Sequence, residues 1–541
     1  MADGLGDFDA VWSLSTLTQL RLRSDGVETQ CLLNFELPDL DANMRQRIEF
    51  GLHAQASRGG RYKWVELAYQ HIQWRFIRYY QYRLRLEALL QETKATSLVL
   101  STSDDSDLLH AATSVCDKLR VQLSLLKGAS DPQSSLLPFL ASYDLPNGIS
   151  SLESLAGKMM AFEYRRRGTK VFYQPYNNLL REPAHSAVLT WRRSICFPGF
   201  RLPATELGKP TSAVDLNTPI RIDHGLDFDT DAWPGFDHCD RQALASAYSY
   251  FERRYSRQLL DRIHASSVSF LRRSGVGRLV LNSDNTGTTR LLARAAKDAN
   301  VWVDYLPHGL IWEDLSLATG TAFGADRVLA WNDSAVATYA SSGRRAAAIS
   351  HPANGGKVQK KRPLTANRAD LRVLIMPPEW VGPSFAGRPD CFERDIIDVL
   401  TALDRLSIRH ASIKVHNSIA EVVGAKLALV KAIAPFAPIS FDIIDSATPT
   451  RDLYDRFDLA IIGPTTGLLE ASRSTTPFVA FRAMMQKAGL FADCSFPSAD
   501  TVEELVREIE GYDVADADEA CLDMSASLTR GPSPFAVGSE Q

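Results

Sequence analysis

This chain of 541 residues lacks the features that mark several large classes of protein. Its seven cysteines are scattered singly without a Cys-x-x-Cys pair, which argues against a disulfide framework or a zinc site. No apolar run approaches the roughly 18 residues that span a bilayer, and the acidic first residues do not resemble a signal peptide. A formal net charge of -4 leaves no basic surplus for nucleic acid, and no solenoid repeat is present. We therefore expect a reducing, cytoplasmic setting and no nucleic-acid partner.

The composition is that of a globular protein, with 45% hydrophobic and 23% charged residues. A chain of this length should form two or more domains. Strand and helix patterns alternate, which predicts an α/β fold with two Rossmann-like domains facing across a cleft. We place an N-terminal domain at 1–355, a linker at 356–370 and a C-terminal domain at 371–512. Within the first domain, 128–240 is rich in Pro, Gly and Ser and predicts an insertion, and 513–541 predicts a flexible tail.

The most informative stretch is 458–481, DLAIIGPTTGLLEASRSTTPFVAF. Apolar runs at its two ends predict buried parallel strands, and Thr465 and Thr466 can cap a short helix that starts at Gly467. Such a turn presents backbone N–H groups at the start of the helix, where phosphate can bind. Glu470, one turn further on, is within reach of a ribose or sugar hydroxyl. The same pattern is also typical of an ordinary capped helix in an α/β sheet.

Two loops in the N-terminal half carry groups suited to proton transfer. Asp104 and Asp105 follow a predicted strand at 97–101, and His308 follows another at 301–306. Open α/β sheets place their ligands at the carboxyl ends of strands, and histidine accepts a proton near neutral pH. The alternatives are a helix-capping cluster for the two aspartates and a structural role for the histidine.

The segment 64–92 contains neither Gly nor Pro and mixes arginines with aromatic residues, which predicts a long helix. Its composition suits contact with an anionic membrane surface or a lipid-linked acceptor. A helix that packs in a core, with arginines reaching outward, has the same composition. An acidic, histidine-bearing loop at 224–240 matches no ligand spacing, so no metal site is predicted.

The motifs between residues 277 and 482 occur in an order that resembles the GT-B fold glycosyltransferases. They are the sequences PHG, ADRVLAW, HPANGG, PPEW, IKVHNS and DLAIIGPTTGLLEA. The nearest resemblance is to bacterial enzymes of capsule, teichoic-acid and lipopolysaccharide synthesis, including glycerophosphotransferases and Kdo- and sialic-acid-type transferases. Before residue 277 the chain is compatible with the fold but carries no further motif.

This resemblance implies roles for particular residues. The implied donor-binding residues are Lys414, His416, Thr465, Thr466, Gly467, Glu470, Glu379 and Trp380. His308 looks like the base or substrate ligand of the family, although Pro307 stands where the family has Gln. The Asp104-Asp105 pair is similar in position to the motif that supplies the base in GT-B sialyltransferases.

We therefore expect a glycosyltransferase that moves a sugar from a nucleotide-sugar to a surface polysaccharide, a lipid-linked glycan or a protein acceptor. A CMP-linked acidic sugar is one option for the donor. Lys414, His416 and the helix start can stabilise the leaving nucleotide without a metal, and an inverting mechanism and no cofactor beyond the nucleotide-sugar are expected. Peripheral contact with the inner membrane is left open. The alternatives are a nucleotide-sugar 2-epimerase of the same fold and a non-catalytic assembly module.

Overall fold

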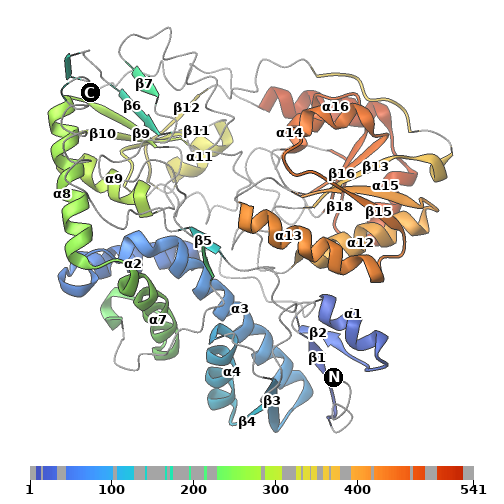
Figure 1. Cartoon of the computed structure of the whole chain (residues 1–541), viewed down its shortest axis with the longest axis horizontal. Coiled ribbons are helices and arrows are strands. Elements are labelled where there is room, and N and C mark those ends of the chain that lie inside the picture. The colour runs from blue at the N-terminus through green and yellow to red at the C-terminus, as the bar shows by residue number, and fades with distance from the viewer. Residues whose placement is uncertain are drawn as a thin grey trace.

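The structure of the chain is a computed structural model. It describes residues 8–13, 16–32, 44–101, 106–126, 140–142, 162, 165–166, 171–174, 194–196, 213–215, 228–281, 287–306, 324–330, 333–341, 343–349, 358–364, 367–377, 391–415, 420–463, 467–481 and 496–527. The two Rossmann-like sheets lie in the left and right halves of Figure 1.

In the described part of the chain, six parallel strands form the C-terminal sheet, in the order β15-β14-β13-β16-β17-β18. They are β13 (Val373–Met376), β14 (His410–Lys414), β15 (Ser440–Ile444), β16 (Leu459–Ile462), β17 (Phe478–Phe481) and β18 (Ser498–Ala499). Numbered along the chain, this is the order 3-2-1-4-5-6 found in Rossmann folds. Every residue of β13, β16 and β17 is buried, because strands covered on both faces need successive apolar residues.

Helices cover both faces of this sheet. They are α12 (Cys391–Arg405), α13 (Ala420–Ile433), α14 (Gly467–Ser472), α15 (Val502–Glu510) and α16 (Val514–Ser527). α12 packs against α13 and α15, whereas α14 packs against α16. Figure 1 shows α14 and α16 on one side of the strands and α12 and α13 on the other.

The N-terminal sheet also has six parallel strands among the described residues, in the order β12-β11-β10-β9-β6-β7. They are β6 (Val171–Gln174), β7 (Ser194–Cys196), β9 (Arg278–Leu281), β10 (Trp302–Tyr305), β11 (Arg327–Ala330) and β12 (Ala346–Ala348). The prediction of an insertion at 128–240 is therefore wrong in part, because β6 and β7 come from it. These strands are only four and three residues long, too short to show a periodic pattern.

The remaining elements of the N-terminal half are mostly helices. They are α2 (Met44–Ser57), α3 (Tyr69–Thr93), α4 (Ser106–Leu119), α7 (His238–Arg254), α8 (Arg257–Ser274), α9 (Gly287–Asp298) and α11 (Asp333–Ser341), with β5 (Leu140–Ser142) antiparallel to β8 (Ala213–Asp215). α3 packs along α4 and α7.

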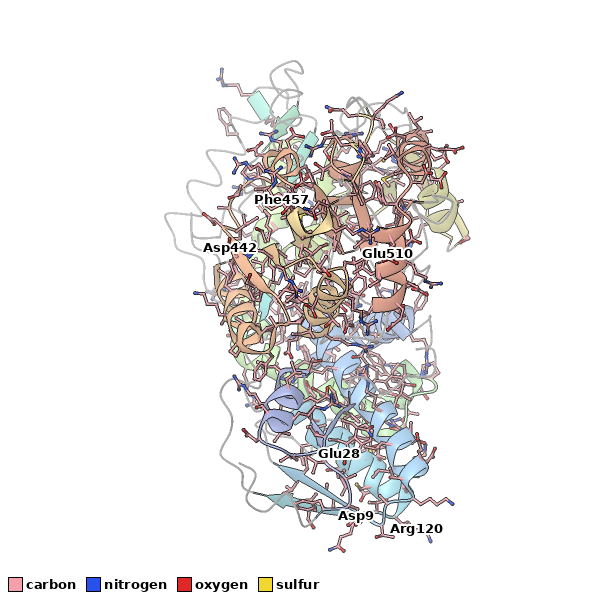
Figure 2. All side chains as sticks on the ribbon, turned by 90° about the vertical axis from the view of Figure 1, so that its right-hand side faces the viewer. Asp9, Glu28, Arg120, Asp442, Phe457 and Glu510 are labelled. Atoms are coloured by element: carbon pink, nitrogen blue, oxygen red, sulfur yellow. The ribbon has the colours of Figure 1, made fainter. Side chains whose placement is uncertain are left out.

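The predicted strand at 97–101 is confirmed as the first strand of a strand-helix-strand unit around α4, but this unit lies outside the main sheet. β3 (Ser97–Ser101) and β4 (Gln122–Leu126) pair in parallel with each other, and they form a sheet of their own. Figure 1 shows this pair at the lower end of the molecule, and in Figure 2 the labelled Arg120 lies at that end, near Asp9 and Glu28. The N-terminal half therefore contains a smaller α/β unit besides its six-stranded sheet.

Of the two interpretations of the aromatic helix, contact with a membrane or packing in a core, the structure supports packing in a core. Phe76, Tyr79 and Tyr82 on α3 are buried, as is Arg85. The guanidinium of Arg75 forms an ion pair with Asp107 of α4, 2.8 Å between Nη2 and Oδ1. Among the described helices, none is both long enough and apolar enough to cross a bilayer.

The prediction of a flexible tail from residue 513 is also wrong over its described part. Val514–Ser527 forms α16, on which Ala517, Cys521 and Met524 are fully buried. These residues recur at helical spacing and so form one apolar face, but Asp, Ala and Ser between them gave the stretch the composition of a linker. Residues 528–541 lie outside the described part.

The two halves of the chain contact each other through their cores and through α1 (Thr16–Ser24). Along the chain, α1 connects β1 (Trp12–Ser13) to β2 (Gln30–Cys31), and these two strands pair in parallel. Its Leu17 N–H donates to Oε2 of Glu393 in α12 at 2.7 Å. One hydrophobic cluster includes Val280 of β9 together with Leu374 of β13.

Candidate functional site

Three of the predicted site residues lie in the described part of the chain: Lys414, Gly467 and Glu470. The other eight lie outside it, and their roles stay predictions. They are Asp104, Asp105, His308, Glu379, Trp380, His416, Thr465 and Thr466. The strands that precede these residues are described, so the structure shows from which edge of which sheet each loop starts.

The donor-side loops start from neighbouring strands of the C-terminal sheet. β13 lies between β14 and β16, and Ile375 is in register with Ile413 on one side and Ile461 on the other. The N–H of Gly463, just after β16, donates to the carbonyl of Met376 at 2.8 Å. Because the sheet is parallel, the predicted loops at 379–380, 416 and 465–466 all leave its carboxyl edge. In Rossmann sheets the point between strands 1 and 4, here β13 and β16, is where ligands bind.

Lys414, the last residue of β14, carries the positive charge of this edge. Its side chain is largely buried, and Nζ lies 3.4 Å from the carbonyl oxygen of Ser446, in the loop after β15. Burial lowers the pKa of the ammonium group, while the carboxylates of Glu470 and Asp445 oppose that change. The lysine is therefore a partly desolvated cation with little hydrogen bonding from the protein, a state that favours binding of an anion.

Glu470 lies in the first turn of α14 and acts electrostatically on Lys414. The pKa of Tyr454 is raised mainly by burial and further by the charge of Glu470. Burial lowers the pKa of Arg473, and the charge of Glu470 opposes this change. The tertiary structure therefore brings together two predicted donor-site residues that come from different strand-helix units. A carboxylate beside a cation at this edge can accept a hydrogen bond from a sugar hydroxyl while the cation holds a phosphate.

Tyr454 is a residue of this site that sequence reasoning missed. Its hydroxyl donates to the carbonyl oxygen of Gly467 at 2.8 Å, and the side chain is almost fully buried. The bond holds the first residue of α14 in place and therefore fixes the start of the helix. Tyr454 precedes β16 along the chain, on the short helical turn Tyr454–Arg456, and no spacing in the sequence relates it to Gly467.

The predicted start of the short helix at Gly467 is confirmed, and the length of the helix limits what its dipole can contribute. α14 has six residues, fewer than two turns, so few peptide dipoles align along it. The electrostatic attraction for an anion at this edge must therefore come from charged side chains such as Lys414 rather than from the helix dipole.

The N-terminal sheet presents its own carboxyl edge. His308 follows β10, and the Leu306 N–H donates to the carbonyl of Leu281 at the end of β9 at 2.7 Å. The strand order of this sheet reverses between β6 and β9, where ligands of open α/β sheets bind. Asp104 and Asp105 follow β3, which belongs to a different sheet, so nothing in the topology places them with His308.

Within the described ranges, no group of three or more His, Cys, Asp or Glu side chains could hold a metal ion.

Comparison with known proteins finds no matching family model and no matching curated protein. Several solved structures align at low identity. HepE of Anabaena, in complex with UDP and glucose, has 12% identity and a TM-score of 0.38, covering 68% of this chain and 96% of its own. MurG of Acinetobacter baumannii has 10% identity and a TM-score of 0.35, covering 67% and 96%. The lipopolysaccharide outer core galactosyltransferase WaaB has 10% identity and a TM-score of 0.34, covering 68% and 96%.

Because these TM-scores are low, the assignment of the fold rests on the strand orders of this chain. The α/β class with two Rossmann-like sheets is confirmed by them.

Proposed function

We propose that the protein is a glycosyltransferase of GT-B type that takes a nucleotide-activated sugar at the carboxyl edge of the C-terminal sheet. The observation that carries the proposal is the meeting of Lys414 and Glu470 beside the β13–β16 switch point of a 3-2-1-4-5-6 sheet. A buried cation and a carboxylate at that point match the phosphate and the hydroxyls of a nucleotide-sugar.

In this proposal Lys414 stabilises the charge that develops on the leaving phosphate. Because its side chain is held in a largely buried position, the ammonium group needs little reorganisation as the glycosidic bond breaks, and the low dielectric strengthens the attraction. Glu470 accepts a hydrogen bond from the ribose or the sugar. His416, Thr465 and Thr466 are assigned to the same phosphate by the sequence motif, and no metal is required.

Deprotonation of the acceptor hydroxyl is assigned to His308 first, with Asp104 and Asp105 as the alternative. His308 leaves the carboxyl edge of the larger N-terminal sheet, where a ligand site is expected, whereas the aspartates leave the separate β3–β4 pair. The acceptor is a surface polysaccharide, a lipid-linked glycan or a protein, and a CMP-linked acidic sugar is one candidate donor.

The test is a thermal-shift and calorimetric screen of the whole chain against CMP, CDP, UDP, GDP and their sugar conjugates, with and without EDTA. A ligand that binds only the native state raises the melting temperature. We expect one nucleotide to stabilise the wild type, and Lys414→Ala to weaken its binding roughly 10- to 100-fold because a charge-assisted contact is lost. Lys431→Ala, an exposed lysine in the last turn of α13, is the matched control and should bind normally.

Each other outcome has a defined meaning. Turnover of a UDP-sugar without any acceptor would replace the transferase with the 2-epimerase alternative. Failure of every nucleotide to stabilise the wild type would reject both enzymes and favour an assembly module. Loss of binding on addition of EDTA would contradict the metal-independent mechanism.

A further inference from the structure

Arg473, the residue that follows α14, has buried polar atoms without a hydrogen-bond partner. Among the described residues, neither its Nε nor its Nη2 atom meets an acceptor, although both are buried. Burial lowers the pKa of the guanidinium, and the negative charge of Glu470 opposes this change. Buried charged donors are normally paired, because desolvation without a partner is costly. A buried charged donor without a partner beside a candidate site indicates that a bound ligand supplies its hydrogen-bond acceptor.

The position of Arg473 directs its side chain toward the donor site. Its backbone N–H donates to the carbonyl of Glu470 at 3.1 Å, so it continues the last turn of the helix. Residues three apart share a helix face, and helical side chains lean toward the N-terminus. The charge of Glu470 acts on the Arg473 guanidinium, which agrees with a side chain that runs back along this helix face, and the start of α14 lies at the carboxyl edge of the sheet.

The other cations around α14 are already used by the fold. Lys361 of the linker donates from Nζ to the carbonyls of Ala471 and Ser474, each at 2.6 Å, and so caps the end of the helix. Arg362 donates from Nη2 to the carbonyl of Phe457 at 2.8 Å. Arg362 leaves its own buried Nε without an acceptor, but its Nη2 is bound by the fold, whereas no described group accepts from either Nε or Nη2 of Arg473.

We propose that Arg473 binds a second anionic group of the donor, distinct from the phosphate held near Lys414. The inference rests on the proposed function and narrows its substrate class to donors with two separate anionic groups. A guanidinium presents parallel N–H donors that match a carboxylate or a phosphate. The second anion is either the β-phosphate of a nucleoside diphosphate or the carboxylate of an acidic sugar, and both have this chemistry.

The experiment compares Arg473→Gln, Arg473→Lys and wild type by calorimetry, using the nucleoside monophosphate of whichever base binds, its diphosphate, and a CMP-linked acidic sugar. We expect Arg473→Gln to weaken the ligand with the second anion tenfold or more and to leave the monophosphate unchanged. Arg473→Lys should retain part of the affinity, because it keeps the charge without the planar fork. If Arg473→Gln binds the diphosphate more weakly, the second anion is a β-phosphate. If it binds only the CMP-linked sugar more weakly, the second anion is a carboxylate.

A second readout separates this role from a structural one. Removing an unpaired buried charge should leave the melting temperature of the ligand-free protein unchanged or higher. A lower melting temperature with equal losses for all ligands would overturn the proposal, as would equal binding by wild type and Arg473→Gln. Arg451→Gln, an exposed arginine of the same domain, is the control. If no nucleotide binds the wild type, the proposed function itself is rejected. If wild type and Arg473→Gln bind the monophosphate and every other ligand equally, only the role of Arg473 is rejected.

Discussion

Lys414 differs from a surface lysine because it loses most of its hydration in the fold. Burial lowers the pKa of its ammonium group, so the charge is lost at a lower pH than for an exposed lysine, whose pKa is about 10.4. Only the protonated form attracts a phosphate. Nucleotide affinity should therefore be constant near neutral pH and fall as the pH rises through the lowered pKa.

Calorimetry from pH 8 to pH 10 tests this expectation, since a nucleotide phosphate with a second pKa of about 6 stays fully ionised over that range. Lys414→Arg should keep its charge and bind without the alkaline loss, because the guanidinium pKa lies above about 12. Identical pH profiles for the two proteins would show that Lys414 does not hold the anion. A bound phosphate should itself raise the pKa of the ammonium group, so Lys414 should keep its proton to a higher pH in the complex than in the free protein.

At the scale of residues, the sequence predicted which side chains carry suitable chemistry better than it predicted which residues contact them. Lys414 could be chosen because its motif resembles a phosphate-binding motif, and Glu470 because it lies in the first turn of a short helix that follows a buried strand. Tyr454 and Arg473 could not be chosen, since the role of Tyr454 comes from a carbonyl 2.8 Å from its hydroxyl, and that of Arg473 from buried donor atoms that no described residue accepts from. Both observations concern the surroundings of a side chain in the folded protein, and spacing along the chain does not reveal them.

At the scale of elements, α16 shows that a helix of linker-like composition can belong to the core. Met524 is fully buried within the cluster that also contains Leu468 of α14, whereas Leu522 on the same helix is 59% exposed. Met524→Ala should cost about 2–5 kcal/mol of unfolding free energy, because it removes buried methylenes and leaves a cavity. Leu522→Ala should change stability by less than about 0.5 kcal/mol.

Chemical denaturation of the two variants measures this difference, with the transition of the C-terminal half followed separately where it is resolved. Equal effects of the two substitutions would mean that α16 does not pack as described. The predicted linker at 356–370 contacts the same helix. The Lys361 N–H donates to Oδ1 of Asp518 at 2.7 Å, so this part of the linker is hydrogen-bonded to α16.

At the scale of the whole molecule, α1 joins the first residues of the chain to the C-terminal sheet. Glu393 lies in the first turn of α12 and accepts the Leu17 N–H, and Figure 1 shows α1 next to α12. A charged acceptor makes a stronger bond than a neutral amide. Glu393→Gln should therefore speed hydrogen exchange of the Leu17 amide by roughly tenfold while leaving β13 and β16 protected.

Glu503→Gln is the control, since Glu503 is an exposed carboxylate on α15 whose ion pair with Arg405 lies on the surface. Its exchange pattern around α1 should equal that of the wild type. If Glu393→Gln leaves the Leu17 amide unchanged, the contact between α1 and α12 contributes nothing to holding the two halves together.

The sequence by itself determined the class of the fold and most of the C-terminal sheet. Short, fully apolar runs such as those at 459–462 and 478–481 predict strands buried on both faces, and the turn residues between them predict a short helix and parallel pairing. Tertiary structure alone decided which strands become neighbours, and hence that β13 and β16 meet and that β3 and β4 stay apart from the larger sheet. It also decided that the aromatic helix and α16 are core elements. Pairing between distant strands and burial of a helix face depend on contacts made across the whole chain, which local composition and spacing do not encode.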